Sequence, residues 1–556
     1  MAPYRSVLIV GGGTAGWLAA AYLQRTLCGD PANPVSIHLV ESADIGTIGV
    51  GEATVPTLRQ TLAVLGIPET ALFGQADATL KNGVRFVGWR NGGTASTDRY
   101  DHPFDPPITL EGYSTMVHWL NLKQRGLVSA PYSECGSVQT ALFDPKLSPK
   151  LMASGNYEAP VPYAYHLDAA KLAALLRDTA VARGVHHTIG HVTAVHTDDA
   201  GIRSITLADG QTLTADLFVD CSGFASLLIG KALDVPWVSY ADHLLCDRAV
   251  ACPLRHNVSH TVGHTDTPQA LRPYTTATAQ AAGWAWEIDL QSRTGTGYVY
   301  ASAHCSDDQA VATLLAHHKG QPRLAEPRLL RMRIGHRARV WEKNCLSLGL
   351  ASGFIEPLES TGIYLVEHAL QQFIDYLPGS DNNTVSRAKY NSLISDLYDE
   401  LRDFIVMHYS LSMRKDTPFW RDATDPARIP PNLADLLALW DEKLPHTTDI
   451  NRKMSLFGAN NYFFILAGLN RLPSAGIGQS RYIAPETSQR VLAHVARIRA
   501  MAVAQSPTMR DYAQKMHAAA AHAPRLAGVG AGLGAGVEAE TGTSAGAGKP
   551  GRPQPA

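Results

Sequence analysis

Cysteine is scarce in this sequence, and the cysteines that it has lie far apart. Seven are scattered over 556 residues, and no two form a Cys-x-x-Cys pair. A dispersed and odd-numbered set provides neither a disulfide framework nor the ligand spacing of a zinc site. We therefore expect a protein of a reducing compartment that holds no metal.

An excess of charge of one sign is missing as well. The formal net charge is −2, and the sequence contains neither a basic run nor an aromatic–basic stripe. Such a sequence gives no reason to expect a polyanionic partner, so we expect no binding to nucleic acid.

Long apolar runs are also absent. No stretch reaches the roughly 18 consecutive apolar residues that a membrane-spanning helix requires. Only residues 1–6 precede the apolar part of the first expected strand, which leaves no room for a signal peptide. We expect a cytoplasmic protein without a membrane anchor.

The N-terminal region contains a strand–helix–strand pattern. Residues 4–10 form an apolar run that ends in glycines, as a buried parallel strand does. Residues 14–25 carry apolar side chains at helical spacing, and residues 35–40 form a second apolar run that ends at Glu41. This order predicts the βαβ unit of a nucleotide-binding domain.

A glycine fingerprint, Gly11-x-Gly13-x-x-Gly16, stands between the first strand and the helix. Gly11 permits a tight turn, Gly13 lets the backbone approach a pyrophosphate, and Gly16 lets the helix pack closely on the strand. The helix N-terminus offers free N–H groups to the phosphates, and Glu41 is placed to accept the ribose hydroxyls. A packed turn without a ligand is the alternative, but the strand, helix and acidic residue together favour a bound dinucleotide.

Further elements can be expected along the chain. Residues 216–220 form an apolar run typical of a central strand, and residues 202–213 predict a hairpin with Asp209-Gly210 at its turn. Residues 386–407 and 486–501 have helical periodicity.

These elements suggest how the chain is divided. We expect an α/β body over residues 1–380, with substrate-pocket segments inserted near residues 100–160. A mostly helical lobe should follow over residues 381–523. Residues 524–556 are so rich in Gly, Ala and Pro that they cannot bury enough apolar surface to offset their ordering entropy, so we expect a disordered tail.

Four more segments contain residues that are candidates for ligand binding or catalysis. Residues 46–56 form a glycine-rich loop, Lys81 stands in Leu-Lys-Asn-Gly, and residues 220–223 are Asp-Cys-Ser-Gly. Residues 349–362 are Gly-Leu-Ala-Ser-Gly-Phe-Ile-Glu-Pro-Leu-Glu-Ser-Thr-Gly. Together with the fingerprint and in this order, they resemble the flavin-dependent halogenases of the tryptophan halogenase family, over about residues 4–520.

The resemblance implies the fold and the cofactor. The fold is α/β, an FAD-binding Rossmann-like body of the GR2-type flavoprotein monooxygenases with a mostly helical second lobe. The segment Trp284-Ala285-Trp286-Glu287-Ile288 resembles a further family signature, with Asp289 where the family has proline. The implied FAD contacts come from four segments: Gly11, Gly13, Thr14, Ala15, Gly16 and Glu41; Gly51, Glu52 and Ala53; Asp220; and Gly349, Gly353 and Ile363.

Lys81 and Glu359 match the two catalytic residues of the family. There, halide is oxidised at the flavin to hypohalous acid, which travels through a tunnel to the lysine. The lysine hydrogen-bonds this acid or forms a haloamine, and either route needs a desolvated amine. The glutamate stabilises the cationic arenium intermediate and accepts the ring proton. The plain alternatives are a solvated lysine and a carboxylate favoured at a helix start by the dipole.

The residues after Glu359 match the halide site of the family. The backbone N–H groups of Thr361 and Gly362 would hold the anion at a helix N-terminus. Ser360 would bridge between the flavin and the lysine and border the substrate pocket. The sequence leaves chloride and bromide open.

His102, Phe104 and Asn461 match the substrate pocket, where the first two sandwich an aromatic ring. Members that act on free tryptophan hold its amino and carboxylate groups with a Tyr-Tyr pair and a Glu shortly before the Asn461 segment. Residues 445–452 contain neither, and Arg452 stands near the expected acid. A charge-assisted contact worth about 1.5 to 3 kcal/mol is missing, so we expect indole, or a larger and less zwitterionic indole or phenol, rather than free tryptophan.

The sequence therefore predicts an FAD-dependent halogenase that uses reduced FAD, O2 and chloride or bromide on an electron-rich aromatic. No second nucleotide fingerprint or reductase module occurs in the sequence, so a separate NAD(P)H-dependent flavin reductase is the expected partner. A flavin-dependent aromatic monooxygenase and a non-catalytic flavin-binding protein are the alternatives, and neither would need Lys81 or Glu359. A monomer and a homodimer both stay open.

Overall fold

The computed structural model describes residues 4–43, 51–256, 270–377, 384–450, 455–473 and 476–522, and the backbone of two short strands at 258–259 and 267–268. The expected tail at 524–556, residues 46–50 of the glycine-rich loop and Arg452 lie outside these residues.

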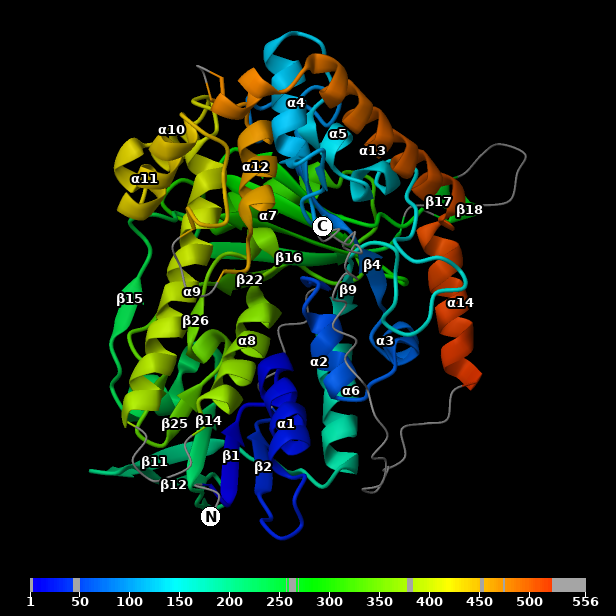
Figure 1. The fold of residues 1–556 in the computed structure, drawn as a ribbon. Helices are drawn as coiled ribbons and strands as arrows, with labels where there is room; N and C mark the ends of the chain where they lie inside the picture. The colour runs from blue at the N-terminus through cyan, green and yellow to red at the C-terminus, as the bar shows by residue number, and fades with distance from the viewer. Residues whose placement is uncertain are drawn as a thin grey trace, which may run out of the picture.

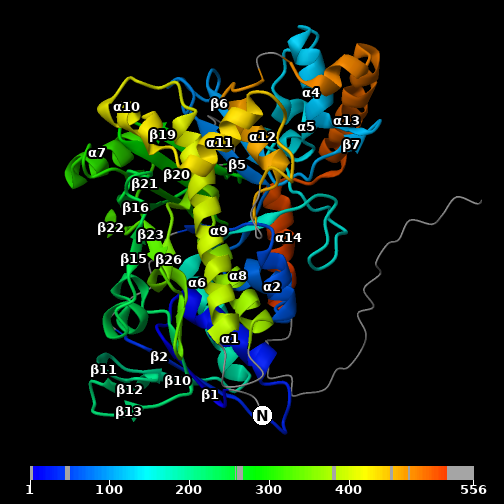
Figure 2. The same cartoon turned by 60° about the vertical axis from the view of Figure 1, so that its left-hand side comes forward.

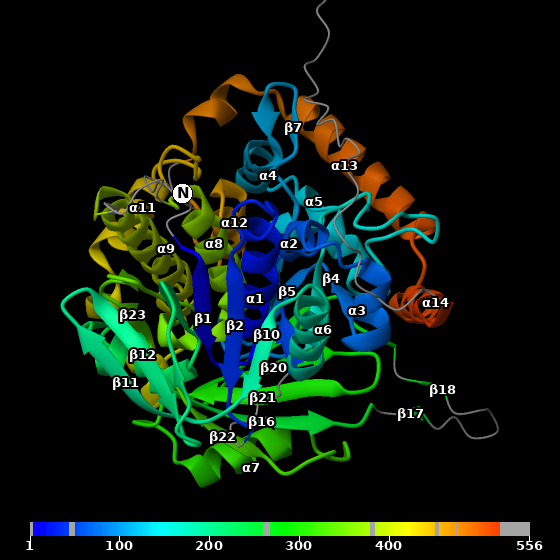
Figure 3. The same cartoon turned by 90° about the horizontal axis from the view of Figure 1, so that it is seen from below.

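The first sheet carries the predicted βαβ unit. Its strands are parallel apart from the last one, and helix α1 (Thr14–Leu27) packs against α6 (Ala169–Ala182) and α8 (Gly362–Asp375). Seen from below, β1, β2 and β10 run side by side with α1 beside them (Figure 3). The order is β10 (His186–Ile189), β2 (Ser36–Glu41), β1 (Ser6–Val10), β14 (Leu217–Asp220), β25 (Cys345–Ser347) and β24 (Trp341–Glu342).

This sheet confirms the predicted α/β fold. Leu8, Ile9 and Val10 of β1 are buried because parallel strands are covered on both faces. The expected central strand is β14, which pairs with β1 on one side and β25 on the other. The expected hairpin is β12 (Gly201–Leu207) with β13 (Thr212–Leu213), and β11 (Val192–Asp198) completes that small sheet.

The second large sheet is mostly antiparallel and lies above the first in Figure 1. It contains the Trp-x-Trp segment on its fourth strand. The long helix α9 (Thr384–Ser410) runs from the end near α8 to the upper end of the molecule (Figures 1 and 2). The order is β22 (Arg328–Arg331), β16 (Arg248–Leu254), β21 (Thr294–Tyr300), β20 (Gly283–Asp289), β19 (Thr275–Gln280), β5 (Gly83–Val87) and β6 (Arg99–Pro103).

A helical lobe covers the outer end of the second sheet. It combines α4 (Thr115–Gln124) and α5 (Tyr132–Gly136) with α12 (Ala459–Gly468) and α13 (Pro485–Gln505), which come from opposite ends of the sequence (Figure 1). A separate apolar cluster that includes Trp119, Tyr132 and Phe463 holds them together. Helix α14 (Met509–His522) leaves this lobe and packs against α3 (Glu69–Gln75).

A small three-stranded sheet connects the glycine-rich loop with the strand that carries Lys81. Its central strand is β9 (Ala164–Asp168), flanked by β3 (Gly51–Ala53) and β4 (Thr79–Lys81). The end of the glycine-rich loop and the strand that ends in Lys81 are therefore hydrogen-bonded to one common strand. Within the described part of the chain, no helix is both long and apolar enough to cross a membrane.

Candidate active site

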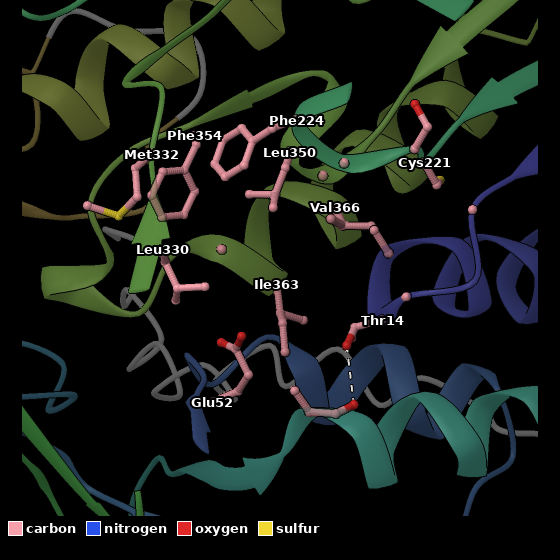
Figure 4. A pocket seen from close by; sticks show the side chains of 18 of the residues that line it. Thr14, Glu52, Cys221, Phe224, Leu330, Met332, Leu350, Phe354, Ile363 and Val366 are labelled. Atoms are coloured by element: carbon pink, nitrogen blue, oxygen red, sulfur yellow. Dashed lines mark hydrogen bonds between the residues drawn. The ribbon is translucent and has the colours of Figure 1, made fainter. Parts of the chain in front are cut away.

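A pocket of about 810 Å³ opens at the carboxyl ends of β1 and β14. In Figure 4, the apolar side chains of Leu330, Met332 and Phe354 lie on one side of it and Thr14 on the other. The pocket is lined by residues from three of the four segments expected to contact FAD: Gly11, Gly13, Thr14, Ala15, Glu41, Gly51, Glu52, Ala53, Gly349, Gly353 and Ile363, with Cys221, Ser222, Gly223, Trp284, Trp286 and Ile288 beside them.

The fingerprint glycines have different surroundings. Gly11 has φ of +112°, and a Cβ there would lie 2.2 Å from the carbonyl oxygen of Cys221. A Cβ on Gly16 would lie 1.8 Å from the carbonyl oxygen of Gly11, so this glycine permits the close packing of helix and strand and does not line the pocket. A Cβ on Gly13 would meet nothing within 4 Å. The backbone at Gly13 is thus open to a ligand, which fits the approach of a pyrophosphate.

Two acidic residues lie at this end of the site. Glu41 ends β2, lines the pocket and accepts a hydrogen bond of 2.9 Å from Nε2 of His187. Asp220 was expected to contact the cofactor, but it does not line the pocket. Its buried carboxylate accepts from the backbone N–H groups of Ser222, Leu228 and Ile229 at 2.8 to 3.0 Å. Asp220 therefore positions the Cys-Ser-Gly turn, and the three residues of this turn line the pocket.

Lys81 is completely buried at the end of β4. Its ammonium donates to the Ser360 hydroxyl at 2.7 Å and to the backbone carbonyl of Thr54 at 3.1 Å. Burial lowers the pKa of Lys81 to about 7, although the charge of Glu359 opposes this shift. The amine is thus desolvated and held between the glycine-rich loop, through Thr54, and the segment that contains Glu359, through Ser360.

Glu359 is also buried, and two histidines hold it. His102 Nδ1 lies 2.9 Å from Oε1 and 3.0 Å from Oε2, and His408 Nε2 lies 3.1 Å from Oε1. Burial alone would raise the pKa of Glu359, but its close contacts with the two histidines outweigh burial and lower the pKa to about 2. The carboxylate is therefore ionised throughout the neutral range.

Asn461 determines where His102 carries its proton. The backbone N–H of Gly458 donates to Asn461 Oδ1 at 2.9 Å, which turns the amide nitrogen toward His102. That nitrogen donates to His102 Nε2 at 2.9 Å. A ring nitrogen that accepts a hydrogen bond carries no proton, so the proton is on Nδ1 and points at Glu359. Asn461, expected to line the substrate pocket, thus also orients the partner of the candidate base.

A second glutamate, Glu356, stands three residues before Glu359 in a different environment. It accepts hydrogen bonds from Trp284 Nε1 at 2.9 Å and from the Tyr409 hydroxyl at 2.7 Å. Burial raises its pKa to about 7. The two carboxyl groups therefore differ in pKa, so one of them can act as an ionised base while the other is partly protonated at neutral pH. The geometry thus selects Glu359 as the ionised carboxylate and gives Trp284 a fixed partner.

The chain turns sharply between Glu359 and α8. Ser360 has φ of +62° and ψ of +37°, a left-handed conformation that is strained for a residue with a side chain. Helix α8 begins at Gly362, and Leu365 N–H makes its bond to the carbonyl of Thr361. The N–H groups of Thr361 and Gly362 therefore precede the first intrahelical donor, and such groups favour an anion. The carboxylate of Glu359, the hydroxyl of Ser360 and the N-terminus of α8 therefore follow one another along this strained turn.

The two aromatic residues expected to sandwich a substrate differ in their packing. The Phe104 ring centroid lies 5.3 Å from Lys81 Nζ. His102 is 2% exposed and packs against Phe404 and Phe457 with ring centroids 5.5 and 5.9 Å away. The structure thus brings Lys81, Phe104, Glu359 and His102 together, but His102 contacts Glu359 and aromatic rings of the protein.

Three of these residues were not identified from the sequence. His408 is in the middle of α9 and carries no local signature, and Phe457 stands beside residues outside the described range. Glu356 shares the Glu-Pro-Leu-Glu segment with Glu359, and only its contacts show its different role. Only a sequence signal that pairs positions in α9 with positions in β6 would have identified His408.

The segment where an amino-acid clamp would be expected provides no unengaged acid among its described residues, 445–450. Its single carboxylate, Asp449, accepts from Trp440 Nε1 at 3.0 Å and from the backbone N–H of His446 at 2.8 Å, and it pairs with Lys443. This carboxylate is thus occupied by contacts within the protein. The expectation about Arg452 lies outside the described residues.

Comparisons with known proteins point to a single family. The family model described as tryptophan halogenase matches residues 6–479. Tryptophan 6-halogenase SttH of Streptomyces toxytricini is 36% identical, over 83% of this chain and 88% of its own. Among solved structures, Tar14, a tryptophan C-6 flavin-dependent halogenase (chlorinase) from taromycin biosynthesis, is 35% identical with a TM-score of 0.83, covering 92% of this chain and 99% of its own. A tryptophan halogenase of Shewanella frigidimarina is 31% identical with a TM-score of 0.84, covering 92% and 98%.

Proposed function

Because the chain belongs to the tryptophan halogenase family, we propose that it halogenates an electron-rich indole, and that indole or an indole-containing compound is a better substrate than free tryptophan. The observation that carries the proposal is the buried group of Lys81, Ser360 and Glu359. The relatives are named for tryptophan, which supports an indole ring as the reacting group. Chloride or bromide would be the halide.

FAD would fit the large pocket, where Gly13 would lie next to the pyrophosphate and Glu41 would accept the ribose hydroxyls. When bound in its reduced form, it supplies with O2 the oxidising equivalents that convert halide to hypohalous acid. A separate NAD(P)H-dependent flavin reductase would supply reduced FAD. Thr361 and Gly362 would hold the halide with their N–H groups at the start of α8.

Lys81 would receive the hypohalous acid on the far side of the Ser360 turn. Its amine is desolvated and fixed by Ser360 and Thr54, so it can donate a hydrogen bond to the acid or be halogenated itself. Glu359 faces the same space as an ionised carboxylate. It would stabilise the positive charge on the ring and accept the ring proton once halogen has been added.

A flavin-dependent monooxygenase is the weaker alternative. Such an enzyme would use the same FAD pocket, but it would not need an amine and an ionised carboxylate buried together. Burying charged groups is costly unless they are paired. The contacts of His102 and His408 with Glu359 therefore support a role for this carboxylate in the reaction.

We expect the purified protein to bind FAD in the pocket next to Gly13, weakly enough to exchange reduced flavin with a reductase. Gly13→Val should weaken binding by at least about 10-fold, because its side chain would enter the space that is open at this glycine. Flavin fluorescence titration measures both affinities. Titration with NADPH but not with FAD, or an unchanged FAD affinity in the variant, would contradict the assignment.

Indole should be turned over with a higher kcat/KM than L-tryptophan. The described residues of the clamp segment offer no unengaged carboxylate for the amino group, since Asp449 is occupied. With no fixed amino-acid end, attack on free indole should follow ring electronics and occur mainly at carbon 3. Steady-state kinetics and NMR of the products measure both. A preference for L-tryptophan with one benzo-ring product would show that other residues form a clamp.

A further inference from the structure

Asn82, the residue after Lys81, has an unusual polar environment. Its side chain is completely buried, and neither the oxygen nor the nitrogen of its amide has a hydrogen-bond partner. Its backbone groups are satisfied, because its N–H donates to the carbonyl of Pro273 at 2.7 Å and its carbonyl accepts from Phe104 N–H at 3.2 Å. The unsatisfied hydrogen-bonding capacity is thus confined to the side chain.

Two other buried asparagines are satisfied at both ends, and the buried amide of Gln139 lacks a partner only at its oxygen. Asn460 accepts from the Tyr132 hydroxyl and donates to the carbonyl of Asp105. Asn121 accepts from Arg125 and donates to Ser488. Among the described residues, Asn82 is the buried amide with both ends unpartnered. An unpaired buried polar group is expensive to keep, and it requires an explanation such as a ligand or an ordered water.

The register of the sheet indicates the direction of this side chain. Val84 of β5 pairs with His102 of β6, and Gly83 pairs with Pro103. The bond from Phe104 to Asn82 continues this antiparallel ladder by one residue. Opposite residues in such a ladder share a face, and side chains alternate along each strand. Asn82 therefore lies on the face that carries Phe104 and His102.

That face is the one on which the chemistry is proposed to occur. Phe104 lies 5.3 Å from the Lys81 ammonium, and His102 contacts the Glu359 carboxylate. The unpaired amide thus lies on the same sheet face as Phe104 and His102, next to the proposed site of the aromatic ring. We propose that Asn82 recognises the substrate, and that the substrate is an aromatic compound bearing an amide group, whose N–H and C=O pair with the two ends of the Asn82 side chain.

The chemistry of the side chain selects this class. A carboxamide offers one acceptor and two donor hydrogens on adjacent atoms, and another amide presents the matching donor and acceptor. A charged amino group would require a carboxylate, and Glu359 is already engaged by two histidines. This inference rests on the proposed function and narrows it to indoles that carry an amide or a peptide unit.

The test compares indole-3-acetamide with 3-ethylindole, which has no amide. We expect the wild-type protein to favour indole-3-acetamide in kcat/KM, and Asn82→Leu to reduce that preference by about 10-fold, because two neutral hydrogen bonds are lost. Asn82→Ala should behave alike if the leucine is not tolerated. Asn121→Leu is the matched control, since its amide is satisfied in the protein. It should lower the melting temperature without changing the preference.

Calorimetric binding of indole-3-acetamide separates this inference from the proposed function, because it requires no turnover. A dissociation constant about 10-fold higher in Asn82→Leu supports the inference even if no halogenated product forms. If Asn82→Leu weakened indole-3-acetamide and 3-ethylindole equally, Asn82 would not recognise the amide group, and the inference would be overturned. An unchanged preference, with or without a lower melting temperature, would assign it to a structural water and overturn it as well.

Discussion

Lys81→Ala should abolish halogenation while leaving the oxidation of reduced flavin by O2 intact. The lysine is proposed to act on hypohalous acid after the flavin chemistry is complete, so the two activities separate. Within the described chain, the hydrogen-bond partners of its amine are Ser360 and Thr54. Product analysis and stopped-flow absorbance of the flavin measure the two activities.

An exposed lysine provides the control for this result. Lys319→Ala, at an exposed position just after α7 (Asp307–His317), should leave both activities unchanged. Because burial lowers the pKa of Lys81 to about 7, the ammonium is present below this pH and the amine above it. A rate that falls as pH rises through 7 would favour the hydrogen-bonded acid, and a rate that rises would favour the haloamine. Substantial halogenated product from Lys81→Ala would remove Lys81 from the mechanism.

Glu359→Gln should slow halogenation by about 100- to 1000-fold, the usual cost of losing an electrostatic partner of a charged transition state. The substitution keeps an oxygen that can accept from His102 Nδ1, so the surrounding packing should persist. FAD affinity should not change, because Glu359 does not line the flavin pocket. Single-turnover kinetics with a fixed dose of hypohalous acid measure the step in which Glu359 takes part.

Glu356→Gln is the matched control, since it stands in the same segment. This carboxyl contacts Trp284 and Tyr409, not the two histidines, and its pKa is raised to about 7 by burial. The rate loss should be much smaller than for Glu359→Gln. Equal losses in the two variants would mean that the segment tolerates no change at all, and the specific role of Glu359 would have to be abandoned.

Local rules predicted the flavin side of the molecule well. The apolar run before Gly11 and the periodicity of residues 14–25 are strong signals for a buried strand and a helix, and β1 and α1 confirm both. Gly11 and Gly16 are required by contacts between neighbouring elements, so their positions follow from the fingerprint itself. The family resemblance added Lys81 and Glu359, and neither residue could have been selected by its type alone.

The surroundings of the proposed catalytic pair could not be predicted in the same way. His408 reaches Glu359 from α9, and Asn461 orients His102 from α12. Both contacts join elements that are far apart in sequence and have no shared pattern. Asp220 illustrates the opposite case, because its motif was correctly placed at a strand end while its carboxylate caps the following turn. Sequence signals thus located the strand end but not the direction of the side chain.

The central claim is most directly tested by mass spectrometry of a complete reaction. The purified protein is incubated with a flavin reductase, NADH, FAD, O2, bromide and indole, and parallel reactions omit bromide or replace the protein with Lys81→Ala. We predict a monobrominated indole, recognised by its paired bromine isotopes, only in the complete reaction with the unaltered protein. A hydroxylated indole that forms equally well without bromide would contradict the account and identify a monooxygenase.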